Sequence, residues 1–255
     1  MSPFLFKLGI RYQKLALYHR DRIDLTAFTD VHLKDIAVEK NPYPHVVVDN
    51  FFKPEVYEAL CRQFNDVRRR GFLNEKWGSD RFHLFDMDYD GYVYSPPAVL
   101  DSENPLSLFF SLEWNWFFSK LFRQFTTFET MFAFHHHPPG DRTGFVHHDN
   151  VDKRFSTEAQ LPNGVIWTET KPPISVRRRK IAVLFFLENE NWQEGDGGEL
   201  GLYKGDAKTL VKKVAPLNNR LCAFLISPES MHAFQENKEE RNSFVQWFHI
   251  PSELV

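Results

Sequence analysis

The sequence is poor in cysteine and contains no long uninterrupted hydrophobic run. Its two cysteines, Cys61 and Cys222, lie far apart and show no spacing typical of a metal or redox site. We therefore expect two buried thiols in a reducing compartment. The apolar residues 4–10 are interrupted by Lys7, and no small-residue cleavage site follows them. This run is too short and too charged to span a bilayer.

The N-terminal run instead predicts an amphipathic helix docked on the domain, with weak attachment to a membrane surface as the alternative. We expect a cytoplasmic protein without a transmembrane segment. The net charge of −3 provides no general attraction to nucleic acid or to acidic membranes, so no nucleic-acid partner is expected. The sequence shows no internal repeat or low-complexity tract, and it predicts no oligomeric state.

The length of 255 residues fits one β-rich domain, residues 1–255, better than two independent domains. Residues 1–129 are expected to form a helical and aromatic support region. Within it, residues 43–50 indicate a strand, and Pro54 starts a helix whose apolar residues recur every three or four positions. A second helix, apolar almost all round, is predicted from Asn104 to about Phe125 and should be buried against a sheet.

The second half of the chain changes character, because short strand-like segments recur between turn residues. Many short strands at such spacing predict an antiparallel sandwich or barrel. The helices before them should brace one outer face. The expected strands are Met131–His136, Gly144–Asp149, Lys180–Leu187, Glu199–Tyr203, Thr209–Ala215, Arg220–Ile226 and Ser243–Ile250.

A scattered set of metal-binding residue types lies on this second half. In an extended segment, His147 and Asp149 point to the same side because strand side chains alternate. His232 would have to reach them through the fold. Two histidines and one carboxylate can cap one face of an octahedral iron and leave open positions for a co-substrate and O₂. The triplet alone is weak evidence, because a solvated surface turn is the more frequent explanation of such a triplet.

The surrounding residues carry a resemblance to a known family. The run from Pro139 to Asn150, the segment Val183–Leu187, the turn at Gly197-Gly198-Glu199-Leu200 and the segment Ala215–Leu221 occur in order before His232, Arg241 and Trp247. Over about residues 130–250 this order resembles the 2-oxoglutarate/Fe(II) dioxygenases of the prolyl-hydroxylase-like group. The resemblance implies a mainly β fold: a double-stranded β-helix (jelly-roll) catalytic core at residues 130–250, braced by N-terminal helices.

The resemblance also implies the chemistry of the site. Fe(II) would bind to His147, Asp149 and His232, and 2-oxoglutarate would chelate it. The reaction would consume O₂, with ascorbate as an additional reductant. Arg241 would clamp the distal carboxylate of the co-substrate, since an inward arginine at a strand start needs an anionic partner. A solvated charge run is the alternative for Arg241. In related halogenases a small residue replaces the carboxylate, so Asp149 predicts hydroxylation.

The chain departs from the family's pattern in several places. The spacing from Pro139-Gly140 to the metal pair is one residue shorter, so His148 competes with His147 as the first ligand. We prefer His147, because no carboxylate lies two residues after His148. Phe186 stands where several relatives have a tyrosine that touches 2-oxoglutarate, and His137 could donate a similar hydrogen bond. Trp247 is also expected to lie near the co-substrate. A separate metal site at His135–His137 is the less favoured alternative to a strand lining the pocket.

The segment from residue 150 to residue 179 is predicted to be a lid-like insert. It ends in the three arginines Arg177–Arg179, and the chain has another run of three at Arg68–Arg70. The simplest interpretation is that both runs lie on solvated faces. A small-molecule substrate, such as an amino acid, a sugar or a natural-product scaffold, is the first expectation, and a peptidyl proline is the second. Desaturation or ring formation would use the same iron site. Two hypotheses from other classes are a cupin-like module that binds metal without catalysis, and a protein that binds an acidic partner through its arginine runs.

Overall fold

The computed structural model describes residues 25–69, 80–83, 90–93, 105–127, 129–161, 164–167 and 175–252. The amphipathic helix predicted at the N-terminus lies outside these residues. Among the described helices, none combines the length and the apolar character that a membrane crossing requires.

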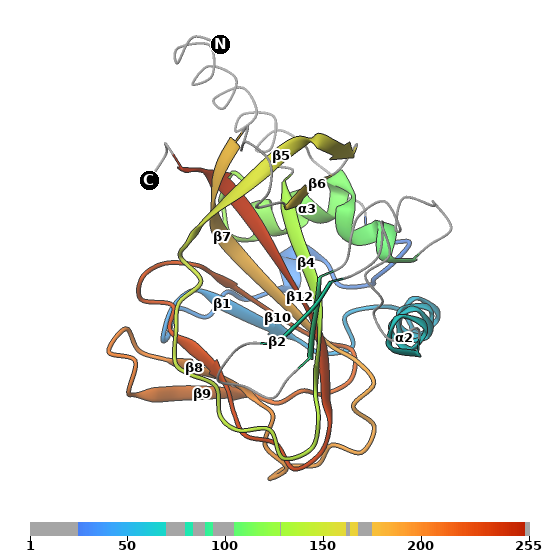
Figure 1. Ribbon diagram of the computed structural model, residues 1–255, viewed down its shortest axis with the longest axis vertical. Helices are drawn as coiled ribbons and strands as arrows, with labels where there is room; N and C mark the ends of the chain where they lie inside the picture. Colours follow the sequence, from blue (N-terminus) through green and yellow to red (C-terminus); the bar gives the residue numbers. More distant parts are fainter. Residues whose placement is uncertain are drawn as a thin grey trace.

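Two antiparallel sheets form the core of the described part (Figure 1). The large sheet has the order β1-β10-β7-β12-β4-β3-β2, β5 pairs with β7 and β6 pairs with β5, and the small sheet has the order β11-β8-β9. This is the expected jelly-roll arrangement. The strands are β1 (His45–Val48), β2 (Asp80–His83), β3 (Asp90–Val93), β4 (Thr130–His137), β5 (Asp152–Leu161), β6 (Gly164–Trp167), β7 (Ser175–Phe186), β8 (Leu200–Tyr203), β9 (Leu210–Val214), β10 (Arg220–Leu225), β11 (His232–Phe234) and β12 (Arg241–Pro251).

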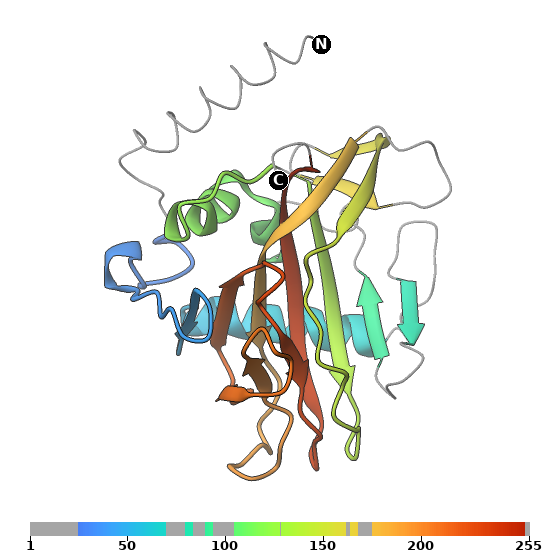
Figure 2. The same ribbon diagram turned by 90° about the vertical axis from the view of Figure 1, so that its left-hand side faces the viewer.

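The helices cover one face of the large sheet, as Figures 1 and 2 show. The described ones are η1 (Leu33–Asp35), α2 (Pro54–Arg69), η3 (Pro105–Phe110) and α3 (Leu112–Leu121). Phe64 of α2 and Trp114 of α3 belong to one buried cluster with Phe185 of β7 and Phe244 of β12. Burying such aromatic side chains contributes roughly 1.5–3 kcal/mol each. The helical brace is therefore a packed layer and fixes the outer face of the sheet.

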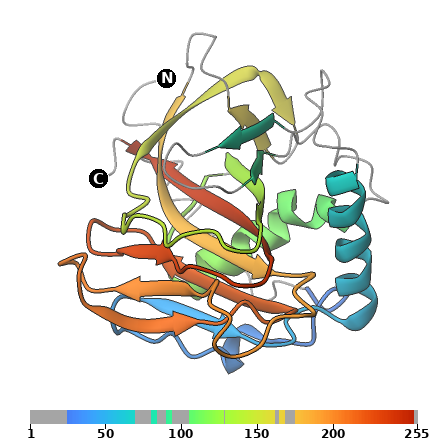
Figure 3. The same ribbon diagram turned by 60° about the horizontal axis from the view of Figure 1, so that its bottom comes forward.

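The inner face of the large sheet faces the small sheet (Figure 3). Because strand side chains alternate, Ala182, Leu184 and Phe186 of β7 point inward, where they share a second buried cluster with Leu200 and Leu202 of β8. Both faces of β7 are covered, so its second half is apolar at every position. The inner face is where the predicted site residues gather.

A single helix was predicted from Asn104 to about Phe125, but the structure has two helices there. The chain forms the 3-10 helix η3 first, and α3 starts after Ser111, which is extended with a ψ of 155°. The Ser111 hydroxyl accepts a hydrogen bond from the backbone N–H of Trp114 at 3.2 Å. A serine at such a helix N-terminus satisfies a backbone donor that has no partner within the helix, so it starts a new helix.

The strand predicted at Gly144–Asp149 is also wrong, and β11 was not predicted. The segment pairs with β11 only intermittently: His147 and His232 exchange two backbone hydrogen bonds at 3.0 and 2.8 Å, and the N–H of Gly144 donates to the carbonyl of Phe234 at 3.0 Å. This backbone pairing is too sparse to make a strand. It nevertheless fixes His147 directly beside His232.

Candidate metal centre and co-substrate pocket

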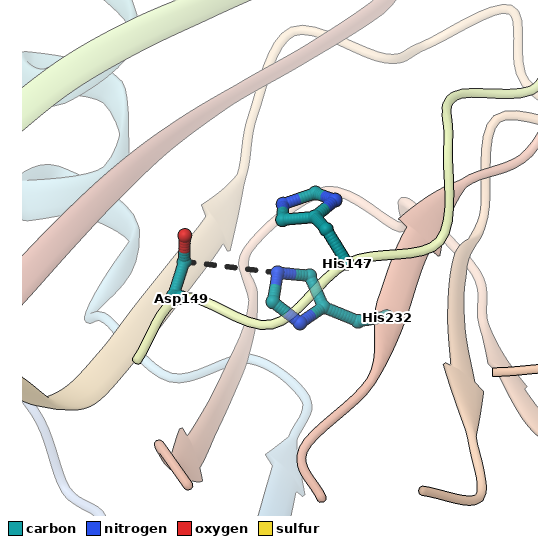
Figure 4. A group of neighbouring side chains, drawn as sticks. All are labelled: His147, Asp149 and His232. Atoms are coloured by element: carbon teal, nitrogen blue, oxygen red, sulfur yellow. Dashed lines mark ion pairs between the residues drawn. The ribbon is translucent and has the colours of Figure 1, made fainter. Parts of the chain in front are cut away.

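His147, Asp149 and His232 come together on the inner side of the fold (Figure 4). Each offers one ligand atom, and these atoms all lie within 4.8 Å of one another. His147 and Asp149 come from the irregular segment before β5, and His232 is the first residue of β11. The Nε2 atom of His232 lies 3.7 Å from Oδ2 of Asp149. A single ion between these atoms would complete a two-histidine, one-carboxylate site.

The hydrogen bonds of the two histidines favour metal binding through Nε2. The Nδ1 atom of His147 lies 3.0 Å from the carbonyl oxygen of Phe145, and that of His232 lies 3.0 Å from the carbonyl oxygen of Ser230. A carbonyl only accepts, so each Nδ1 must carry the proton and each neutral ring keeps a free lone pair on Nε2. Burial lowers the pKa of His232 to about 4, which keeps its ring neutral near pH 7.

His148 points away from this cluster. It is exposed, and its Nδ1 accepts a hydrogen bond from the backbone N–H of Asn150 at 3.3 Å. Of the two neighbouring histidines, His147 is the one that the backbone pairing with β11 carries to the other ligands. This geometry agrees with the preference for His147 over His148.

Asp149 is buried and held by two donors. The Nη1 of Arg179 donates to Oδ1 at 2.9 Å, and the indole N–H of Trp247 donates to Oδ2 at 2.6 Å. Burial alone would raise the pKa of Asp149, but the charge of Arg179 and the other polar neighbours outweigh it and hold that pKa below its ordinary value. The carboxylate is therefore ionised and available to a cation. Trp247 thus contacts the carboxylate through its indole N–H, and its contact with a co-substrate, which the sequence led us to expect, stays a prediction.

Arg241 opens β12 and is buried, with only 3% of its surface exposed. Its Nη1 donates to the hydroxyl of Ser243 at 2.8 Å. The guanidinium lies over the rings of Phe186 and Phe234, at 4.9 and 5.6 Å from their centroids. The prediction of an inward arginine at this strand start is confirmed, and the solvated charge run is excluded for this residue. The Phe186 ring therefore packs against the Arg241 guanidinium.

His137 lies opposite Arg241 in the pairing of β4 with β12. Its Nδ1 is 2.7 Å from Oδ2 of Asp141, and its ring stacks on Phe234 at 3.9 Å. Burial and the charge of Arg241 lower the pKa of His137 well below its ordinary value, so the ring is neutral. His137 therefore lies beside Arg241, and both contact Phe234. Its contact with a co-substrate stays a prediction.

A separate metal site at His135–His137 has no support. Within the described residues, the grouping of His147, Asp149 and His232 is the single one with a geometry that could hold a metal. His135 is partly buried, and burial lowers its pKa well below its ordinary value. It faces the same side of β4 as His137, because side chains two residues apart on a strand share a face.

Arg177–Arg179 were predicted to form a solvated face. This prediction is wrong for Arg179, which is buried. β7 begins at Ser175, so the run lies in the sheet and each arginine pairs with a carboxylate of this chain. Arg177 pairs with Glu129, Arg178 with Asp152 and the buried Arg179 with Asp149. These internal pairs remove the observation that suggested an acidic partner. Residues 168–174 of the predicted insert lie outside the described residues, so its role as a lid stays a prediction.

His249, on the inner face near Arg179, should make the stability of the protein acid-sensitive. Burial and the charge of Arg179 lower the pKa of His249 to about 3. An unfolded histidine titrates near pH 6.5, so below that pH the unfolded chain takes up a proton that the folded chain does not, and stability falls as pH falls towards about 3. In His249→Phe, the slope of the free energy of unfolding against pH should be shallower by about 1.4 kcal/mol per unit.

Urea unfolding of the metal-free protein between about pH 6.5 and about pH 5 measures these slopes. His148→Phe is the matched control, since it makes the same substitution at an exposed histidine. Equal slopes for wild type and His249→Phe would contradict the prediction.

Comparison with known proteins shows what this arrangement is similar to. Residues 132–249 match the model of the 2OG-Fe(II) oxygenase superfamily. The fold is similar to a prolyl-4-hydroxylase from Pseudomonas putida, with a TM-score of 0.56, 18% identity and coverage of 80% of this chain and 91% of that one. It is also similar to a prolyl hydroxylase from Trichoplax adhaerens, solved with a hypoxia inducible factor oxygen degradation domain peptide fragment, with a TM-score of 0.57, 13% identity and coverage of 98% and 94%.

A viral collagen prolyl hydroxylase from Paramecium Bursaria Chlorella virus-1, solved with 2OG, has a TM-score of 0.50 and 14% identity, with coverage of 80% of this chain and 95% of that one. At such identities these structures show the fold alone. The family match covers residues 132–249, less than half of the chain, and the two-histidine, one-carboxylate cluster lies within that range. The chain is therefore similar in fold to these prolyl hydroxylases, and residues 132–249 are similar to the 2OG-Fe(II) oxygenase superfamily.

Proposed function

We propose that this protein hydroxylates an unactivated C–H bond, with Fe(II) held by His147, Asp149 and His232 and with the distal carboxylate of 2-oxoglutarate held by Arg241. The observation that carries the proposal is that the short strand β11 contacts the metal cluster at one end and a buried arginine of β12 at the other. His232 of β11 is a ligand, and Phe234, two residues on, lies against the Arg241 guanidinium. Two residues of a strand span about 7 Å, a distance that a five-carbon diacid can bridge.

The charges of the site agree with a dianionic co-substrate. Asp149 is ionised, and Arg241 brings a positive charge to an apolar wall of Phe186 and Phe234. A buried guanidinium binds a carboxylate strongly, because its planar fork matches the two oxygens. When bound, the iron and its co-substrate supply the oxidising chemistry. The residues of this chain hold them, and burial keeps the His232 ring neutral.

The rim of the metal centre indicates the kind of group that enters. Phe145 is 55% exposed and Val151 is 39% exposed, on either side of the pair His147 and Asp149. The ring of Phe145 lies 4.7 Å from that of His147. An exposed apolar rim favours an aliphatic part of the substrate over a charged one. We propose a small molecule with such a part, for example an amino acid, a sugar derivative or a natural-product scaffold.

A prolyl residue in a peptide is the second candidate. It is favoured by the fold shared with the prolyl hydroxylases described above, and a pyrrolidine ring would suit the same apolar rim. Succinate release with a panel of small molecules and with proline-containing peptides separates the two. Stimulation by peptides alone would reject the small-molecule proposal.

Anaerobic absorption spectroscopy tests the iron and co-substrate sites directly. We expect a visible charge-transfer band when the metal-free protein receives both Fe(II) and 2-oxoglutarate, and no band with either alone. Zn²⁺ with 2-oxoglutarate is the matched control, because a d¹⁰ ion is redox-inactive. Bound iron without a band would instead favour the cupin-like module that binds metal without catalysis.

A further inference from the structure

We infer that Arg179 is a positioning residue, which fixes the Asp149 carboxylate so that one oxygen alone faces the metal. The inference rests on the proposed function, since it takes Asp149 as an iron ligand. Arg179 is the residue of this site that alternation along β7 does not predict. Its placement depends on an irregularity in the sheet.

A β-bulge turns Arg179 towards the site. β12 pairs Phe248 with Ile181, but its next residue, His249, pairs with Arg179, so Lys180 is an extra residue on β7. Without the bulge, Arg179 would share the outer face with Ile181, which packs in the helix-covered cluster. The extra residue reverses the alternation and directs the guanidinium to the inner face. Bulges often re-aim a side chain beside an active site.

The guanidinium, an indole ring and the carboxylate then form one unit. Arg179 donates to Oδ1 of Asp149 at 2.9 Å, and Trp247 donates to Oδ2 at 2.6 Å. The guanidinium also lies over the Trp247 ring at 3.9 Å, so the two donors hold each other in place. Oδ2 is the oxygen that faces His232, at 3.7 Å from its Nε2. Oδ1 is directed away from the metal by its arginine, which leaves a ligand of one oxygen.

Arg179 affects metal affinity in two opposing ways. As a hydrogen-bond donor it prevents rotation of the carboxylate, which favours binding, and as a buried cation it repels the metal ion. Outer partners of metal ligands are commonly worth about 10–100-fold in metal affinity. We therefore expect the positioning effect to dominate. A purely electrostatic role would have the opposite sign, because removing the cation would strengthen metal binding.

Metal titration of variants tests the inference. Co(II), monitored by its visible absorption and by chelator competition, should bind about 10–100-fold more weakly to Arg179→Gln than to wild type. Arg179→Lys keeps the charge but loses the planar fork and the stacking, so it should bind almost as weakly. The Co(II) band shape should change in both, because the carboxylate is free to rotate. Arg178→Gln is the matched control: Arg178 is adjacent on β7 and pairs with the exposed Asp152.

Trp247→Phe provides an independent variant. It keeps an aromatic ring for the guanidinium but removes the N–H that Asp149 accepts, so its Co(II) affinity should also fall. Equal or tighter binding in the Arg179 variants, with a wild-type band shape, would overturn the inference even if those variants are less stable to heat. If wild type itself bound no metal, the proposed function would fail instead, and the two failures are therefore distinguishable.

Discussion

His147→Ala should abolish iron binding, whereas His148→Ala should leave iron binding and turnover close to wild type. The two residues are neighbours of the same type, but His147 alone is paired through its backbone with His232. Losing an outer partner of a metal ligand costs about 10–100-fold, so losing a ligand should lower turnover by about 10³-fold or more. The comparison decides between two assignments that the sequence spacing left open.

Iron content after anaerobic reconstitution and succinate release together measure this difference. Thermal unfolding of the metal-free variants is the control for misfolding, and both should unfold near the wild-type temperature, since neither side chain is fully buried. Adding Fe(II) should then raise the unfolding temperature of His148→Ala but not that of His147→Ala. If His148→Ala lost iron and His147→Ala kept it, the ligand assignment would be wrong.

The sequence predicted the ligand set and Arg241 because these residues lie in motifs with a fixed order. His147, Asp149 and His232 need only the right fold to meet. The strand pattern predicted a sandwich or barrel, and the resemblance to the dioxygenases implied the jelly-roll and the ligand set. Arg241 could be inferred from its place at the start of a strand, where an inward side chain must find a partner.

Arg179 could not be inferred in the same way. Side chains alternate along β7, so a residue two positions before the apolar Ile181 is expected on the same outer face, and this residue is Arg179. A run of three arginines also usually indicates a solvent-exposed face. The bulge at Lys180 reverses that result, and no residue type in the run marks it. A weaker signal for the placement of Arg179 was that the charged run continues directly into a buried strand. Arginines in such a position need carboxylate partners close by.

The break between η3 and α3 shows a different limit. Residues 104–125 have a continuous apolar pattern, which predicts one helix, and Ser111 is the signal that was overlooked. Serine is favoured where a helix begins, so a serine within an apolar run can start a second helix. The sparse pairing of Gly144–Asp149 with β11 depends on contacts far apart in the sequence, and local patterns do not report them.

The predicted clamp leads to the second large effect. In Arg241→Leu the KM for 2-oxoglutarate should rise by about 10²–10³-fold, because truncating one partner of a buried, hydrogen-bonded charge pair costs about 2–5 kcal/mol. Leucine suits the apolar neighbours Phe186 and Phe234, so the variant should still fold. Ser243→Ala removes one acceptor of the guanidinium and should cause a much smaller rise.

The strongest test of the clamp uses the co-substrate itself. Wild type should discriminate strongly between 2-oxoglutarate and 2-oxobutyrate, which lacks the distal carboxylate, and Arg241→Leu should lose most of that discrimination. A general loss of folding or of iron would affect both acids equally, so the ratio of their rates isolates the contact with the carboxylate. If the ratio stayed at its wild-type value in Arg241→Leu, the distal carboxylate would bind elsewhere, and Arg241 would serve the structure of the pocket rather than its ligand.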